Sequence, residues 1–580
     1  MADTFAHQLQ IQPRFGNRSR ALVVDGHATA RSLLAAQLRG LGVGQVLHSA
    51  TAHDARQHLE NRGVDVLLVE YRLNADTLGQ ALIDEWRRDG LLPLRTVVVM
   101  LSSQASYQVV AQVAESALDG FVIKPFTPRM LEDRLIAAFQ RKDALREIYD
   151  AVEAEAHAQA LGLCEALYKQ RAPYWTYAAR IGAELALRLE QLALADAMYA
   201  AVLADKAVPW AKLGLARVLQ AGGDAVRAVS TIQNLLADEP TYADAYDVMG
   251  RIHAEQGNLA GAIEAYRQAV EITPHSVARA QKYGILAWYA AEPDVALAAL
   301  EHAARIGGDS PQFDHQALLL LAMARFQKGD AAGLQQCQKQ LDGALARQPK
   351  PVAQTGDAAD PRNDRLRRLA QMAQALVAVQ AKDRPLLQAC LVPVADDLLA
   401  PGFDVEAASN LLSLIATSDA AGLTPQQADD WVRRAGLRFC VSKQVTEMLA
   451  KACDPAPLLV QLVRAAHAEI NEISRTALSE GLAGRHQRAV EALLQAVERT
   501  RNAKLLELAQ AALERHRANI AAAEALAERC GLLQALCSTA GRGHLLVHDA
   551  GGRPPGGLDL PALGASAWRR DAPTAQSAPA

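Results

Sequence analysis

The sequence predicts a multi-domain protein in which a doubly wound α/β domain with five parallel strands precedes an all-helical superhelix. Over residues 19–142, short apolar runs alternate with helix-length amphipathic stretches, the pattern of strands and helices that follow one another in turn. From about residue 141 onward the apolar period is helical, and small residues then recur at a spacing of 34. A chain of 580 residues is too long for one hydrophobic core, so we expect separate domains.

Five short runs of Val, Ile and Leu are the predicted strands of the N-terminal domain. Continuous apolar runs between helices are typical of a parallel sheet that is covered on both faces. Five of them indicate a flavodoxin-like arrangement, in which the carboxyl ends of the strands line the functional crevice. The runs are 21–24, 46–47, 64–69, 96–101 and 120–123.

Three sets of residues share the 34-residue period of the helical part. The sets are Gly182, Ala216, Gly250 and Gly284; Ala228, Ala262 and Ala296; and Pro240 and Pro274. Small residues let the two helices of a hairpin approach closely, Gly257 is suited to end a helix, and each proline is suited to begin the next unit. The pattern resembles the tetratricopeptide repeat, which we expect over residues 143–345.

Composition divides the rest of the chain. Residues 346–365 are rich in Pro, Asp and small polar residues and are predicted to be a flexible linker. Helical, repeat-like patterning resumes over 366–538, and the sequence leaves open whether the linker separates two independent superhelices. Residues 1–18 and 539–580 show little apolar periodicity, so we expect disordered termini.

Composition and motifs also exclude several classes of function. A net charge of −4 gives no reason to expect a nucleic-acid surface, and the chain has no run of 18 apolar residues that would predict a membrane span. Its seven cysteines contain no Cys-x-x-Cys pair, which indicates buried, reduced thiols rather than a metal site. No phosphate-cradling, zinc-protease or serine-hydrolase motif occurs. We therefore expect a cytoplasmic protein that is not an enzyme.

Four segments of the α/β domain resemble the response-regulator receiver domains of bacterial two-component systems. They are LVVDGHATARSLL at the first strand, VDVLLVEYRL at the third, VVVMLSS at the fourth and GFVIKPF at the fifth. The Lys-Pro pair after an apolar strand is the most specific of these elements. The resemblance implies a receiver over residues 19–142.

The resemblance also implies where a phosphoryl-transfer pocket would lie. In the family, two adjacent acidic residues after the first strand and one aspartate after the third bind Mg²⁺, and that aspartate takes the phosphoryl group. In this sequence Asp25 matches the first acidic position, but Gly26 stands at the second and Glu70 at the phosphoacceptor position. Because Mg²⁺ requires several hard oxygen ligands in tight octahedral geometry, we expect no cofactor beyond weak Mg²⁺ binding at Asp25 and Glu70.

The phosphoryl-contact and switch positions of the family are retained. Ser102 matches the hydroxyl position, and Lys124 matches the lysine that grips the phosphoryl oxygens. Phe121 matches the aromatic switch position, and Pro125 is expected to follow a cis peptide bond, as in the family.

These departures predict a pseudo-receiver. Glu70 carries one methylene more than aspartate, and a misplacement near 1 Å can cost about 10²-fold in rate. One interpretation is that Glu70 pairs with Lys124 and imitates the phosphorylated charge. The other is that Glu70 is a tolerated acid in a domain kept for docking. Residual phosphorylation remains a third outcome.

Stacked repeat hairpins form a superhelix whose concave side binds peptides or helices of partner proteins. The resemblance implies that the first helix of each unit lines this groove. The candidate groove residues are Trp210, Arg217, Gln220, Asp244, Asp247, Arg251, Glu255, Gln281, Trp288 and Tyr289. Trp, Tyr and Arg suit partner anchoring. The alternative is that Trp210 and Trp288 pack between units and that the charged residues are solvated surface.

The sequence therefore predicts a non-enzymatic signalling adaptor of the two-component type. Its receiver face would dock a histidine kinase or another regulator, and its repeats would bind a protein target. One alternative is a working response regulator that a histidine kinase phosphorylates and whose receiver gates the repeats. A second is a transcriptional regulator acting through the C-terminal helices, which would bind DNA with a steep salt dependence.

Overall fold

The computed structural model describes residues 19–73, 78–103, 118–308, 313–347, 361–417 and 423–537, together with Leu545, Pro554, Gly557, Leu558 and Leu560. The expected disordered segment 1–18 and most of 539–580 lie outside the described residues, as does 348–360 within the expected linker. The chain divides into two compact units. Unit 1 comprises 1–249, 271–273 and 551–580, and unit 2 comprises 250–270 and 274–550.

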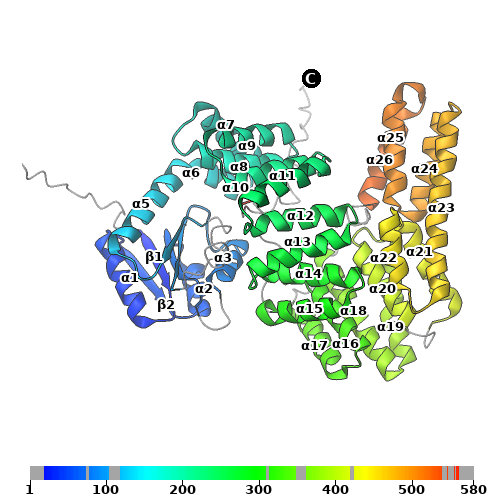
Figure 1. Cartoon of the computed structure of the whole chain (residues 1–580), viewed down its shortest axis with the longest axis horizontal. Coiled ribbons are helices and arrows are strands. Elements are labelled where there is room, and N and C mark those ends of the chain that lie inside the picture. Colours follow the sequence, from blue (N-terminus) through cyan, green and yellow to red (C-terminus); the bar gives the residue numbers. More distant parts are fainter. Residues whose placement is uncertain are drawn as a thin grey trace, which may run out of the picture. The chain divides into compact units, whose positions relative to one another are not determined.

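The N-terminal domain is the expected five-stranded parallel sheet (Figure 1). The strands are β1 (Arg20–Val24), β2 (Gln45–Ser49), β3 (Val66–Glu70), β4 (Val97–Ser102) and β5 (Gly120–Ile123). Their order is β2-β1-β3-β4-β5, and every neighbouring pair is parallel. Two predicted runs begin earlier than the strands themselves, because Val64 and Thr96 lie in the turns that lead into β3 and β4.

Alternate residues of the strands face two separate apolar layers. Ala21 and Val23 of β1 belong to a layer with α1 (Ala28–Gly40) and α5 (Pro128–Ala144). Leu22 and Val24 belong to the opposite layer with α2 (Ala52–Asn61) and α3 (Gly79–Arg88). Both faces of the sheet are therefore covered, which explains why the strand sequences are continuously apolar.

The described residues beyond the sheet are helical. Figure 1 shows them as successive antiparallel pairs. The α-helices are α6 (Arg146–Glu153), α7 (His157–Gln170), α8 (Trp175–Arg188), α9 (Leu192–Asp205), α10 (Pro209–Ala221), α11 (Ala225–Asp238), α12 (Ala243–Glu255), α13 (Leu259–Ile272), α14 (Val277–Tyr289), α15 (Pro293–Gly307), α16 (Gln316–Gln327), α17 (Ala331–Arg347), α18 (Pro361–Ala381), α19 (Arg384–Asp396), α20 (Val405–Thr417), α21 (Pro425–Phe439), α22 (Lys443–Ala452), α23 (Pro457–Leu482), α24 (His486–Thr500), α25 (Ala503–Arg515) and α26 (Ala523–Leu536). None of the helices within the described ranges has the length and hydropathy needed to cross a bilayer.

The 34-residue period has a direct structural cause. Each glycine of the first set lies against a side chain of the neighbouring helix. An added Cβ at Gly284 of α14 would stand 2.7 Å from Cγ and 3.1 Å from the backbone N of Leu300 in α15. Gly257 has a φ of +74° and follows the end of α12, as predicted. Pro240 and Pro274 lie just before α12 and α14.

The expected linker does not separate two superhelices. Helix α17 ends at Arg347 and α18 begins at Pro361, and these two helices pack against each other. One apolar core in unit 2 extends from Ala254 to Val463 and includes side chains from both sides of the linker. A further cluster from Ile470 to Cys537 lies among α23–α26.

The C-terminal region expected to be disordered contains buried positions. Leu545 is 9% exposed and Leu560 is 8% exposed. Leu560 belongs to the apolar cluster of the first repeat helices in unit 1. The expected tail therefore makes contacts with the repeats at this position.

The close helix pairing predicts a specific stability effect. Gly284→Ala places a methyl group inside van der Waals distance of the Leu300 backbone, and overpacking of this kind costs about 1–3 kcal/mol. The control is Gly343→Ala in α17, where nothing lies within 4 Å of the added Cβ and alanine improves helix propensity by up to ~1 kcal/mol. Urea unfolding followed by circular dichroism should show a lower midpoint for Gly284→Ala only. Equal midpoints for the two variants would refute the packing explanation.

Candidate functional site

The carboxyl ends of three strands bring one lysine and two carboxylates together. Asp25 directly follows β1, Glu70 is the last residue of β3, and Lys124 directly follows β5. The Lys124 Nζ donates to Asp25 Oδ2 at 2.7 Å and also to Glu70 Oε2. Asp25 is fully buried and Glu70 is 7% exposed. One ammonium group therefore neutralises part of a doubly acidic, desolvated pocket.

Backbone and side-chain donors fix Asp25 in this pocket. The backbone N of His27 donates to Asp25 Oδ1 at 2.8 Å. Arg31 of α1 donates to the Asp25 backbone oxygen at 2.6 Å. The Asp25 backbone N donates to Ser49 O at the end of β2, at 3.1 Å. Both oxygens of the Asp25 carboxylate are thus engaged, one by His27 and one by Lys124.

The other matched positions surround this centre. Ser102 is buried at the end of β4, and its backbone oxygen accepts from the Lys124 backbone N at 2.7 Å. Phe121 of β5 is half-buried against the apolar layer of α2 and α3. The Lys124–Pro125 peptide bond is cis, as expected. The fold therefore brings Asp25, Glu70, Lys124 and Ser102 to one edge, while Phe121 lies on the helix-covered face.

Gly26 lies against the segment that follows β3. A Cβ at this position would stand 2.9 Å from the backbone oxygen of Leu73. An acidic side chain at Gly26 would therefore require the β3–α3 connection to shift. The missing second acid is accompanied by a backbone arrangement that leaves no room for it.

Burial and charge act in opposite directions on the pKa values of Glu70 and Lys124. Burial raises the pKa of Glu70, and the hydrogen bond from Lys124 opposes that rise without cancelling it. Burial by itself would lower the pKa of Lys124, but the hydrogen bonds to Asp25 and Glu70 outweigh it, so this pKa is raised. Lys124 thus stays charged and is the group that makes an ionised Glu70 tolerable in the pocket.

This donor set fits Mg²⁺ poorly. The two carboxylates already bind an ammonium group, and Gly26 supplies no oxygen side chain. No cluster of three or more His, Cys, Asp or Glu side chains suited to a metal occurs among the residues the structure describes. Mg²⁺ would have to displace Lys124 and complete its octahedron largely with water.

Arg217, a half-buried candidate groove residue, forms an ion pair with Glu184, a buried residue that was not predicted from the sequence. Its Nη1 lies 2.7 Å from Glu184 Oε2, and its Nη2 lies 3.1 Å from Glu184 Oε1. Arg188 Nε lies 3.6 Å from the same carboxylate. Burial alone would raise the pKa of Glu184, but Arg217 and Arg188 hold it below its usual range. Glu184 precedes Arg217 by nearly one repeat period, which is the signal that could have identified it.

Several groove candidates are buried structural groups instead of exposed ones. Tyr289 accepts a hydrogen bond from Gln316 Nε2 at 2.7 Å and donates to Asn410 Oδ1 at 3.2 Å. Gln281 Oε1 accepts from the backbone N of Asp314 at 2.8 Å. The expectation of exposed anchors is wrong for these two residues, because their polar atoms join neighbouring helices.

The remaining candidates divide by exposure. Asp244 and Asp247 are buried, which contradicts the alternative that they are solvated surface. Gln220 and Arg251 are half-buried, and Glu255 is exposed. The half-buried residues Trp210 and Trp288 pack against the cores of their units. Trp210 meets Tyr199 edge-to-face with ring centroids 6.2 Å apart, as the alternative of packing between units predicts.

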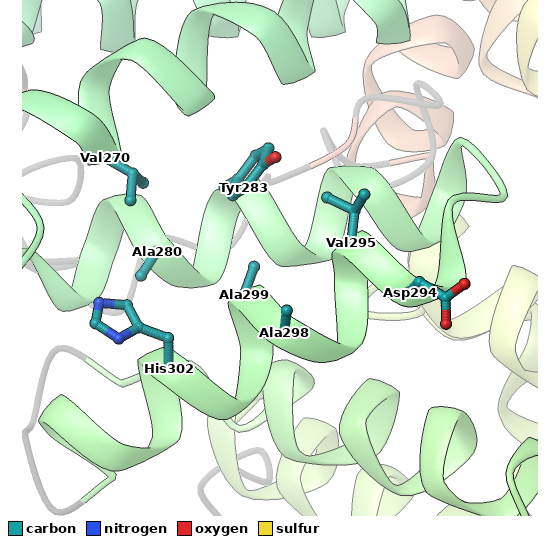
Figure 2. Close-up of a pocket in the computed structure, with 8 residues that line it drawn as sticks. All are labelled: Val270, Ala280, Tyr283, Asp294, Val295, Ala298, Ala299 and His302. Carbon is teal, nitrogen blue, oxygen red and sulfur yellow. The ribbon is translucent and has the colours of Figure 1, made fainter.

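A hollow on α13–α15 was not anticipated from the sequence. It has a volume of about 460 Å³. Figure 2 shows His302 and Asp294 at its opposite ends, with apolar side chains between them. His302 Nε2 lies 2.7 Å from Pro274 O, and Asp294 forms an ion pair with Lys328 at 2.8 Å. These two polar groups are thus engaged elsewhere, and the hollow suits an apolar side chain. Its lining residues are Val270, Ala280, Tyr283, Asp294, Val295, Ala298, Ala299 and His302.

Comparison with known proteins identifies two parts of the chain. Residues 21–136 match the response regulator receiver domain, and residues 243–276 match the tetratricopeptide repeat. The chemotaxis protein CheY of Pseudomonas aeruginosa is 26% identical over 122 residues, which cover 21% of this chain and 97% of CheY. Chemotaxis protein CheY-3 of Vibrio cholerae is 25% identical over 122 residues, covering 21% of this chain and 92% of that protein.

Solved structures with similar helical parts are more distant. The C-terminal part of a TPR repeat-containing protein from Cytophaga hutchinsonii has a TM-score of 0.29 and 14% identity, covering 53% of this chain and 99% of that one. The type IV pilus biogenesis factor PilW has a TM-score of 0.26 and 20% identity, covering 41% of this chain and 96% of that one. Scores at this level carry no functional argument.

The pocket predicts a pH-dependent effect of removing its lysine. Lys124→Ala leaves two buried carboxylates without their shared ammonium, a loss we expect to cost about 2 kcal/mol near pH 7.5. This is less than the ~3–5 kcal/mol of a fully buried pair, because Lys124 is partly exposed to solvent. The pKa of Glu70 rises further without Lys124. A carboxyl group whose pKa is raised by folding favours the folded state at low pH and disfavours it as pH increases. The variant should therefore be closest to wild type near pH 5.

Hydrogen exchange of the β3 and β4 amides, read by mass spectrometry, measures this local stability. The matched control is Lys169→Ala, which removes an exposed ion pair with Glu165 and should change stability by less than about 0.5 kcal/mol. If Lys124→Ala exchanges no faster than Lys169→Ala at pH 7.5, the lysine does not hold the pocket together.

Proposed function

Because the chain joins a receiver domain to tetratricopeptide repeats, we propose that it is a non-enzymatic adaptor of the two-component type whose receiver no longer depends on phosphorylation. The combination of these domains is that of a regulator with protein-interaction repeats. The proposal that the receiver no longer depends on phosphorylation is supported by the direct hydrogen bonds of Lys124 to both Glu70 and Asp25.

Glu70 supplies the negative charge that a phosphoryl group would otherwise bring. In a working receiver the lysine binds the phosphoryl oxygens, which are strong hydrogen-bond acceptors. Here the longer side chain of Glu70 reaches the Lys124 ammonium unaided. Of the two interpretations that the sequence leaves open, this contact supports the charge-imitating one over the silent one.

Three further features support the loss of phosphoryl transfer. The Glu70 carboxylate, which would have to attack the phosphoryl group, is bound by Lys124. Burial also raises the pKa of Glu70. The second metal-binding acid is replaced by Gly26, whose surroundings do not accommodate a side chain. A reaction that relies on Mg²⁺ to neutralise phosphoryl oxygens therefore lacks part of its machinery.

A polar joint connects the receiver to the repeats within unit 1. Asp119 directly precedes β5 and pairs with Arg141 of α5 at 2.6 Å. The Arg141 guanidinium also lies 4.7 Å from the ring centroid of Tyr177 on α8. Asp119 directly precedes β5 and Lys124 directly follows it, so the strand links the pocket to the first repeat helices. On this proposal the pocket fixes one arrangement of that joint.

The partners follow from the two domains. The receiver face would dock a histidine kinase or another regulator, and the repeats would bind a protein target, with the whole acting in the cytoplasm of a bacterium. No step of this account requires catalysis by the chain.

Phosphorylation is the direct test. The full chain is incubated with acetyl phosphate and Mg²⁺, and its intact mass and peptides are measured. CheY of Pseudomonas aeruginosa, one of the relatives reported above, is treated in parallel as the positive control. We expect the control to gain a phosphoryl group and this chain to gain none. A phosphoryl group on Glu70 would overturn the proposal in favour of a working response regulator.

A further inference from the structure

Part of the chain's own C-terminal region lies on the first repeat helices. A Cβ added at Gly557 would stand 2.6 Å from Glu184 Oε2 and 2.9 Å from Arg217 Nη1. Arg188 Nη1 donates to the backbone oxygen of Leu560 at 3.2 Å. Leu558 and Leu560 pack against the apolar cluster of these helices. All of these contacts lie within unit 1.

The contacted residues belong to helices α8 and α10, each of which is the first helix of its hairpin. This is the side of a repeat superhelix that is expected to receive partner segments, and Arg217 was a groove candidate on that ground. The surface combines the partly buried Glu184–Arg217 ion pair with an adjoining apolar cluster. Gly557 therefore lies against the ion pair, while Leu558 and Leu560 lie against the apolar cluster.

Each described residue of the segment has a physical reason to be there. Glycine at position 557 leaves the Glu184–Arg217 pair undisturbed, because an added Cβ would force the ends of these two side chains and the Pro554 ring to shift. Leu560 is 8% exposed, so its side chain is removed from water by the repeats. Its carbonyl oxygen accepts a hydrogen bond from Arg188, whose guanidinium also lies beside the Glu184 carboxylate. Gly557 N donates a backbone hydrogen bond to Pro554 O at 2.8 Å, and Leu560 N donates one to Leu558 O at 3.0 Å.

We propose that the surface formed by Glu184, Arg188 and Arg217 is a peptide-binding site for a segment of the type Gly-Leu-x-Leu. The chain's own Gly557, Leu558 and Leu560 occupy this site until a partner segment of the same chemistry displaces them. A tethered segment has an effective concentration in the millimolar range, so a few contacts suffice to keep the site occupied. Only molecules in which the site is open can bind a partner. The apparent affinity for the partner therefore falls as the open fraction falls.

This inference rests on the proposed function only in taking the repeats as the partner-binding part of the chain. It makes no use of the Lys124 pocket. Phosphorylation of Glu70 would overturn the pseudo-receiver and leave this site untouched, whereas failure of the peptide experiment would leave the pseudo-receiver untouched.

The test uses full-length protein and a fluorescent peptide with the sequence of residues 554–560, PPGGLDL. Gly557→Ala should eject the internal segment, because the added methyl group collides with Glu184 and Arg217. We expect it to bind the peptide at least about tenfold more tightly than wild type in fluorescence anisotropy. Leu560→Asp, which places a charge in the apolar cluster, should give the same gain independently.

Two controls sharpen the result. Gly481→Ala in α23, where nothing lies within 4 Å of the added Cβ, should bind the peptide as wild type does. A peptide in which the second glycine is alanine should bind none of the variants. The proposal is overturned if Gly557→Ala and Leu560→Asp bind the peptide no better than wild type, or if no variant binds it at all.

Discussion

One ammonium group shared between two buried carboxylates is the interaction on which the N-terminal domain depends. Asp25 and Glu70 end up side by side because parallel strands deliver their carboxyl ends to the same edge of the sheet. Two such charges in a desolvated pocket repel each other and lose their hydration. Lys124 compensates for both effects, and the 2.7 Å contact with Asp25 fixes it at the base of the pocket. The single ammonium balances one of the two carboxylate charges, and it is shared by hydrogen bonds to both of them.

The sheet and the identity of this pocket could be predicted because both follow from local pattern. Apolar runs of strand length set the order of strands and helices, and the chemistry-bearing residues follow those runs directly. From the length of the Glu70 side chain, contact with Lys124 could be proposed as a hypothesis. The distance between the two groups could not be predicted from the sequence. The obstacle at Gly26 could not be predicted either, because it arises from the backbone oxygen of Leu73, which a sequence pattern does not position.

In the helical part, too, some features could be predicted from local pattern and others could not. The period of 34 identified the hairpins, since small residues such as Gly284 stand where helices must approach most closely. Which polar residues would be exposed was not predictable, because that depends on contacts between distant segments. Tyr289 is buried by Asn410, which lies 121 residues further along the chain. The placement of Leu560 on the first repeats is a contact of the same kind, over 372 residues from Arg188.

If Glu70 and Lys124 act as one unit, a double-mutant cycle will measure the coupling between them. Glu70→Gln, Lys124→Ala and the double variant are compared with wild type by hydrogen exchange of the N-terminal sheet at pH 7.5. Residues in direct contact within a charged network couple by about 0.5–3 kcal/mol. We expect a favourable coupling of at least ~1 kcal/mol, with the double variant more stable than Lys124→Ala alone. Strictly additive effects would contradict it.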